Sequence, residues 1–149
     1  MAQDERKWHP PKEPHEYDDI PGTVVFDAQR SRLGYNLNKF LYSLMKAENR
    51  KAFLADESTY LDQFHLMPEQ KTAVMKRDWN TLLALGGVSY ALAKLAFTDQ
   101  HSYQFMAAEM AGVSQEAYVN MMLAGGRSVE GRSPRLGSRA SGRLVRDHR

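Results

Sequence analysis

The side chains with the chemistry to bind a metal ion are five histidines: His9, His15, His65, His101 and His148. No two of them stand three or four residues apart, so the sequence has no helical histidine pair of the kind that binds zinc. The chain contains no cysteine, which excludes a thiolate metal site, a cysteine nucleophile and a disulfide framework. We therefore predict no metal site in this chain and interpret the histidines as surface residues.

Two carboxylate pairs, Asp18-Asp19 and Asp56-Glu57, have the residue types that general acid–base catalysis uses. Adjacent residues of a helix or turn point in different directions, and both pairs stand where acidic residues commonly cap helices. Neither Gly86-Gly87 nor Gly125-Gly126 is followed by the Lys-Ser/Thr of a phosphate loop. No serine has a histidine and an acid close to it in the sequence, which leaves only a spatial arrangement open. We predict no catalytic residue in this chain.

The 149 residues are 42% hydrophobic and 26% charged, as in an ordinary globular domain. The net charge of +2 is unevenly distributed. Residues 127–149 contain seven arginines against Glu130 and Asp147, a balance of +5, so residues 1–126 carry a balance of −3. The arginines are suited to nucleic acid or anionic lipid, but no aromatic residue accompanies them for base stacking. We favour a disordered tail, and we expect neither nucleic acid nor membrane as a partner.

The compartment is predicted from three absences in the sequence. The first residues, MAQDERKWHPPKEPHEY, have no apolar core of a signal peptide. The most apolar window, Leu82 to Phe97, is interrupted by glycines, Ser89 and Lys94, so it predicts a buried helix pair and no membrane span. A chain without cysteine suits a reducing compartment. We expect a cytoplasmic protein.

The longest amphipathic pattern follows Asp27, whose carboxylate is suited to accept the free amides of a first helical turn. Its apolar side chains recur three or four residues apart, as one face of a helix requires. They are Leu33, Leu37, Phe40, Leu41, Leu44 and Met45. We predict one helix from about 28 to 48, ending near Asn49.

Shorter patterns of the same kind predict the remaining helices. They span about 49–54, 56–64, 68–85, 88–98, 103–111 and 114–124, and an interruption near Arg77-Asp78 is left open. No stretch alternates apolar and polar residues for long enough to make a sheet. We predict an all-α fold, an irregular compact cluster of six or seven mostly short helices. A flexible N-terminal arm (1–16) precedes this helical domain (17–126), and a Gly/Ser/Arg-rich tail (127–149) follows it.

The two predicted helices nearest the C-terminus concentrate methionines and aromatic residues. These are Tyr103, Phe105, Met106, Met110, Tyr118, Met121 and Met122. Any one of them is as well explained by ordinary core packing. Together they give two short helices more apolar surface than a small domain can cover, and such a patch usually contacts a partner. We predict a partner interface at Met106, Met110, Tyr118, Met121 and Met122.

Many short motifs resemble the small alpha subunit of protocatechuate 4,5-dioxygenase, a type II extradiol dioxygenase. They are DDIPGT (18–23), Phe26, Gln29-Arg30, Gly34-Tyr35, Leu37-Asn38, SLMKAENR (43–50), 55–57, 60–62, Gly86-Gly87, Tyr90, Lys94, Thr98-Asp99, Ser102, Gln104, Met110 and GGRSVEG (125–131). The resemblance covers about residues 17–131. It departs from the family at Gln100-His101, where Gly-Lys is expected, and at the proline-rich start and the arginine tail.

This resemblance implies an all-helical subunit without catalytic residues. A separate beta subunit of the family holds Fe(II) through two histidines and a glutamate, and opens the catechol ring to a semialdehyde. The alpha subunit covers the mouth of that site in an α₂β₂ assembly and excludes water. The resemblance places Tyr103 at the rim of the substrate pocket, with Phe105 beside it, although a core position for Tyr103 stays open.

Two alternatives to the dioxygenase subunit remain. One is a free-standing helical interaction or regulatory protein with the same fold and no dioxygenase partner. The other, weaker one is a nucleic-acid-binding protein that uses the arginine tail.

Overall fold

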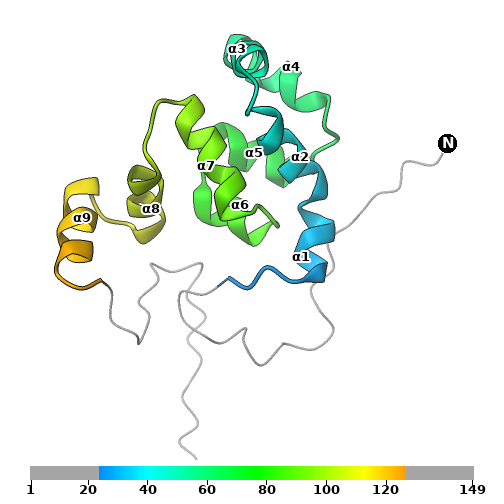
Figure 1. Ribbon diagram of the computed structural model, residues 1–149. Coiled ribbons are helices and arrows are strands. Elements are labelled where there is room, and N and C mark those ends of the chain that lie inside the picture. Colours follow the sequence, from blue (N-terminus) through cyan, green and yellow to red (C-terminus); the bar gives the residue numbers. More distant parts are fainter. Residues whose placement is uncertain (1–23, 127–149) are drawn as a thin grey trace, which may run out of the picture.

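The computed structural model describes residues 24–126, and all regular structure in this part of the chain is helical (Figure 1). The helices are α1 (Ala28–Leu33), α2 (Tyr35–Ser43), α3 (Ala47–Ala55), α4 (Glu57–Asp62), α5 (Pro68–Lys76), α6 (Trp79–Ala84), α7 (Ser89–Thr98), α8 (Tyr103–Ala111) and α9 (Gln115–Leu123). The all-α prediction is confirmed. The predicted arm (1–16) and tail (127–149) lie outside the described residues.

The described part has nine helices, where six or seven were predicted, because two predicted helices are divided. The helix expected over 28–48 is interrupted at Gly34, which lies against the backbone of Gly86: a Cβ on Gly34 would lie 1.9 Å from the Gly86 carbonyl oxygen. The second division is at Arg77, whose φ of 54° is left-handed. This is the interruption near Arg77-Asp78 that the sequence left open.

The predicted end of the first helix near Asn49 is also wrong. Helix α2 ends at Ser43, and α3 begins at Ala47, so Asn49 lies inside α3. Its side-chain amide donates to the Ser43 carbonyl (2.8 Å), while Arg50 donates to the carbonyls of Leu44 and Met45 (2.9 Å each). These side chains satisfy the free carbonyls at the end of α2 and stabilise the turn there.

Side chains that accept a backbone hydrogen bond cap five of the helices. They are Asp27, Asp56, Asp78, Ser102 and Ser114, each accepting from the amide three residues later. This confirms the predicted cap at Asp27, and it gives Asp56 a structural role. Pro68 is the first residue of α5, where its missing N–H costs nothing.

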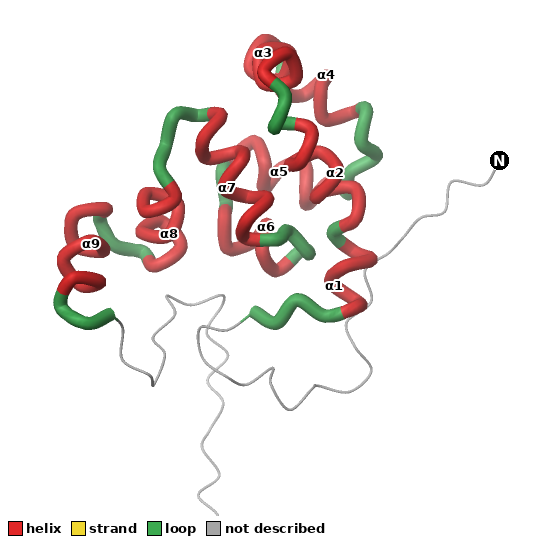
Figure 2. Tube along the Cα trace, in the orientation of Figure 1, coloured by secondary structure: helices red, strands yellow, loops and turns green. Residues whose placement is uncertain are grey.

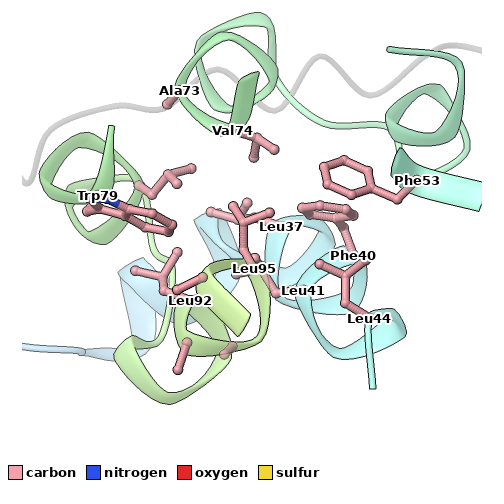
Figure 3. Packing of buried hydrophobic residues seen from close by; sticks show 14 of the residues in the cluster. Leu37, Phe40, Leu41, Leu44, Phe53, Ala73, Val74, Trp79, Leu92 and Leu95 are labelled. Atoms are coloured by element: carbon pink, nitrogen blue, oxygen red, sulfur yellow. The ribbon is translucent and has the colours of Figure 1, made fainter. Parts of the chain in front are cut away.

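The hydrophobic core lies between α5 on one side and the paired helices α2 and α7 on the other (Figure 3). Helix α2 contributes Leu37, Phe40, Leu41 and Leu44, all essentially unexposed. Each such side chain stabilises the fold by roughly 1.5–3 kcal/mol. Gln70, the buried polar residue at the start of α5, donates to the carbonyls of Leu33 (3.0 Å) and Leu85 (3.1 Å). It thereby ties α1 and α6 to α5.

The last two helices lie at one edge of this body. Figures 1 and 2 show α8 and α9 beyond the end of α7, on the side away from α3 and α4. Helix α8 packs on α6 and α7, while α9 packs mainly on α8 and contains no buried residue. None of the helices in the described part of the chain has both the length and the apolar character that crossing a membrane requires.

Candidate partner interface

The α8–α9 pair is held together at its polar end. The Ser102 hydroxyl accepts the amide of Phe105 (3.1 Å) and the side chain of Gln115 (3.2 Å), so the starts of both helices are joined at one oxygen. On the other side, Asn80 in α6 donates to the carbonyl of Met110 (3.2 Å). These contacts fix α8 against the body and α9 against α8.

The predicted pocket-rim residues occupy the first turn of α8. Tyr103 is 48% exposed, so it is not a core tyrosine. Phe105 is partly buried and stacks on the His101 ring, with 3.9 Å between the ring centroids and 17° between the planes. Tyr103 thus presents its ring to solvent beside the stacked rings of Phe105 and His101. Such a surface is suited to a flat aromatic molecule or to a protein partner.

The loop before α8 takes a shape that glycine normally provides. Gln100 has a φ of 63°, a left-handed conformation that costs a residue with a Cβ about 1–2 kcal/mol. It stands where the family resemblance led us to expect glycine. The backbone conformation at this position therefore suits the glycine that the family resemblance led us to expect. The residues themselves are Gln100 and His101 instead of Gly and Lys.

The same loop is anchored by an ion-pair network that the sequence did not predict. Asp99, at the end of α7, accepts from Arg77 at 2.6 and 3.0 Å, and Glu57 accepts from the same guanidinium at 2.6 and 2.9 Å. The guanidinium also lies 5.4 Å from the Phe53 ring centroid. Burial lowers the pKa of Arg77, but the hydrogen bonds with Asp99 and Glu57 outweigh this, and the pKa lies above its ordinary value. The loop that leads to Tyr103 thus begins at Asp99, which Arg77 holds in place.

The methionines predicted for a partner interface divide between two environments. Met106 is fully buried in the core, because its side chain faces the body of the protein. Its predicted place in the partner interface is therefore wrong. Met110 is partly buried and packs against that core. Tyr118 and Met121 in α9 are partly buried, whereas Met122 is 51% exposed.

Two exposed apolar residues of this edge escaped the sequence prediction. Leu123 at the end of α9 is 82% exposed, and Val113 between the two helices is 39% exposed. The sequence could have indicated Leu123, because it directly follows Met121 and Met122. We call the exposed side chains of Tyr103, Val113, Met122 and Leu123 the edge surface. Exposed apolar side chains on two packed helices make this edge a candidate for a protein–protein contact.

Groups that could bind a metal are dispersed in the described residues. No three side chains of His, Asp or Glu lie together there as a potential metal site. His65 and His101 are the described histidines, whereas the other three lie outside, as does the Asp18-Asp19 pair. Of the second carboxylate pair, Asp56 caps α4 and Glu57 binds Arg77. The donor set in residues 24–126 therefore does not fit an Fe(II) site.

Several of the motifs that carried the resemblance prove to support the fold. Gly34 and Gly86 make the close backbone contact, and Asn38 bonds both to the Gly86 carbonyl (2.8 Å) and to the Val88 amide (2.9 Å). The SLMKAENR motif forms the α2–α3 turn through Asn49 and Arg50. These residues hold the framework on which α8 and α9 are mounted.

Two comparisons with known proteins bear on this arrangement. Residues 37–123 match the family model described as aromatic-ring-opening dioxygenase LigAB, LigA subunit. The chain is also 30% identical, over 116 residues, to a gallate dioxygenase of Pseudomonas putida. That match covers 77% of this chain but 34% of the relative, so the chain spans about a third of the length of the relative.

Proposed function

Because this chain belongs to the family of LigA subunits of LigAB aromatic-ring-opening dioxygenases, we propose that it is the non-catalytic alpha subunit of such an enzyme. The catalytic partner is a separate beta subunit that contains Fe(II), and the complex is a cytoplasmic α₂β₂ assembly. Its substrate is a catechol carboxylate of the protocatechuate or gallate type. The name of the Pseudomonas relative supports this substrate class.

The observation that carries the proposal is the edge surface formed by α8 and α9. Helix α9 has no buried residue, and Leu123 and Met122 are 82% and 51% exposed. Covering those two side chains with a partner would remove apolar surface from water, which favours association. Side chains that are fully desolvated near the centre of an interface are generally those whose truncation costs most affinity.

Tyr103 gives the interface its role in the reaction. Its phenol is a hydrogen-bond donor and acceptor at the exposed start of α8, and the Arg77–Asp99 contact fixes the loop before it. Placed over the mouth of the partner's pocket, the ring would exclude water while the hydroxyl bonds a substrate oxygen. The chain's contribution is therefore binding, orientation and shielding.

The proposal is tested by mixing the purified chain with the isolated Fe(II)-loaded beta subunit of a LigAB dioxygenase. We expect a stable complex that cleaves protocatechuate or gallate, detected by absorbance of the ring-opened product. Replacing both Met122 and Leu123 by Ser should weaken binding by about 30-fold or more. Met75→Ser is the matched control, since Met75 is 50% exposed on α5, a helix with few contacts to the edge. No complex, with no rise in activity, would favour a free-standing interaction protein instead.

The role of Tyr103 is measured in the assembled complex. Tyr103→Phe removes only the hydroxyl and should raise KM by about tenfold, as expected for loss of one hydrogen bond of about 1.4 kcal/mol. The affinity for the beta subunit should stay unchanged in this variant. Unchanged KM, kcat and substrate preference in both Tyr103→Phe and Tyr103→Ala would show that Tyr103 is not at the pocket.

A further inference from the structure

A second exposed surface lies on the outward faces of α2 and α7. Both helices carry an aromatic residue, a lysine and a second aromatic residue at positions i, i+4 and i+7, a spacing that places all three on one helix face. These residues are Tyr35, Lys39 and Tyr42 in α2, and Tyr90, Lys94 and Phe97 in α7. The four aromatic side chains are between 42% and 62% exposed. We call these six residues the aromatic–lysine face.

Both halves of this face lie away from the core, on two helices that are neighbours. Helices α2 and α7 pack against each other, and Leu37 of α2 and Leu95 of α7 point toward Val74 of α5 (Figure 3). Tyr35 and Tyr90 stand about half a turn away from those buried positions. The contact between Gly34 and Gly86, together with the bond from Asn38 to Val88, brings the starts of the two helices together.

The charge of the aromatic–lysine face is of one sign. Neither α2 nor α7 contains an aspartate or a glutamate. Lys39 lies 5.6 Å from the Tyr35 ring centroid and Lys94 lies 4.3 Å from that of Tyr90, and no described residue forms an ion pair with either lysine. A ligand for this face should therefore bring carboxylates to the lysines and flat apolar groups to the rings.

Charge disfavours two of the three occupants that the chain itself could provide. A two-fold dimer through this face would bring the lysines of two copies close together, which like charge disfavours. Residues 127–149 carry seven arginines against two acids and are disfavoured for the same reason. Residues 1–23 instead carry six acids against three basic residues.

The composition of residues 1–23 matches the face in a second respect. They contain Pro10, Pro11 and Pro14, and proline-rich segments typically bind to surfaces lined by aromatic rings. Glu13 and Glu16 flank the last of these prolines, and Trp8 and Tyr17 lie within ten residues of each other. Carboxylates and rings thus alternate along the segment as lysines and rings do on the face.

The covalent connection favours the contact further. The segment joins the described chain at Val24, immediately before α1, and α1 leads directly into α2. Twenty-three residues can extend about 75 Å, whereas α2 is only about 14 Å long. A tether of this length gives an effective concentration in the range of about millimolar. We propose that residues 1–23 bind the aromatic–lysine face of α2 and α7 within the same chain.

The proposal is tested on the full chain by paramagnetic NMR, which the absence of native cysteine makes straightforward. A spin label is attached to His15→Cys, and backbone amide signals of the isotope-labelled chain are compared with the label oxidised and reduced. We expect the signals of Tyr35, Tyr42, Tyr90 and Phe97 to be lost. Signals of α5, on the opposite side of the core, should keep their intensity.

Charge reversal of the face provides the specific control. In the Lys39→Glu, Lys94→Glu double variant the lost signals should return, while the Lys51→Glu, Lys76→Glu variant, which changes exposed lysines of α3 and α5, should behave as the parent. The milder Lys39→Gln, Lys94→Gln variant replaces the first if charge reversal affects folding. Signal loss that persists in either face variant overturns the proposal.

Two further outcomes would assign the face to another occupant. Signal loss in an equimolar mixture of spin-labelled unenriched chain and enriched unlabelled chain would show that the contact is between copies. Absence of signal loss, together with protection of Tyr35 and Tyr90 only after the beta subunit is added, would assign the face to that partner. Either result overturns the proposal. The first does not bear on whether the chain forms a dioxygenase complex, whereas the second would itself show binding to the beta subunit.

Discussion

The helical body from α2 to α7 and the α8–α9 edge treat apolar side chains differently. Every helix of the body buries at least one residue, and its polar side chains are bound: Gln70, at 1% exposure, has hydrogen-bond partners on three helices or their ends. Helix α9 buries none, and its C-terminal Leu123 is 82% exposed. The body has a buried core beneath its exposed side chains, whereas α9, the outer helix of the edge, has apolar side chains and buries none of them.

The largest loss of stability should follow from adding a side chain where Gly34 contacts the Gly86 backbone. In Gly34→Ala, the added Cβ would meet the Gly86 carbonyl at 1.9 Å, so α1, α2 and the α6–α7 turn must move apart. We expect the free energy of unfolding to fall by about 3 kcal/mol or more. Denaturant titration followed by circular dichroism measures this change.

The matched glycine at the edge is Gly125, where an added Cβ would meet no atom within 4 Å but the backbone has a φ of 110°. Gly125→Ala should cost about 1–2 kcal/mol, from its backbone conformation alone. Equal losses in the free energy of unfolding for Gly34→Ala and Gly125→Ala would show that close packing does not distinguish the body from the edge.

Two methionines from one sequence pattern provide the next comparison. Met106→Ala should destabilise the chain by about 3 kcal/mol, because a fully buried side chain leaves a cavity. Met122→Ala should change stability by less than about 0.5 kcal/mol, since half of that side chain is already in solvent. Thermal unfolding of both variants tests this, and a large loss for Met122→Ala would place it in a core.

The ion-pair network of Arg77 should have a smaller effect. Arg77→Met leaves the carboxylates of Glu57 and Asp99 without their partner in a half-buried setting, which we expect to cost about 2 kcal/mol. Lys71→Met, which removes an ion pair with the exposed Asp62, should cost less than about 0.5 kcal/mol. In Arg77→Met, hydrogen exchange of loop 99–102 should increase. An unchanged exchange rate would show that the Arg77 network does not hold the loop that leads to the edge.

The smallest effect concerns the chemistry of the helix caps. Aspartates cap three helices before the edge, at Asp27, Asp56 and Asp78, whereas α8 and α9 are capped by Ser102 and Ser114. A hydrogen bond from the Thr59 hydroxyl, followed by one from its amide, lowers the pKa of Asp56 below the ordinary value of 3.8. The stability from this cap is therefore fully present above pH 3.8 and is lost as the pH falls through the lower pKa of the folded state.

This prediction is checked by carbon NMR titration of the Asp56 carboxyl. Thr59→Val removes the hydroxyl and should move the pKa of Asp56 back toward 3.8. The serine caps of the edge do not titrate, so they should hold their helices over the same pH range. A pKa of Asp56 that does not respond to Thr59→Val would contradict the assigned cause.

Local patterns predicted the fold class and most helix ends, because these depend on residues close together in the chain. Asp27 caps a helix as expected, and the helices predicted over 103–111 and 114–124 are found as α8 and α9. The break at Gly34 was missed, since its cause, Gly86, lies 52 positions further along the chain. The turn after Ser43 likewise depends on where the side chains of Asn49 and Arg50 point.

The candidate interface could be predicted as a region but not residue by residue. A stripe of methionines identifies the apolar side of α8 and α9, yet Met106 and Met122 have the same chemistry and differ only in what lies opposite them. The position of Arg77 between Glu57 and Asp99 is also invisible locally, because these residues are 20 and 22 positions away from it. Tertiary packing decides both features.

The attachment of α9 to the molecule mainly through α8 has an evolutionary consequence. Mutations on the outer side of this α8–α9 hairpin can accumulate without disturbing the packing of Phe40, Val74 or Leu92. Related chains can therefore diverge at this edge while retaining one scaffold. For the same reason, the hairpin is a natural unit to transplant when a chimera with a new partner is wanted.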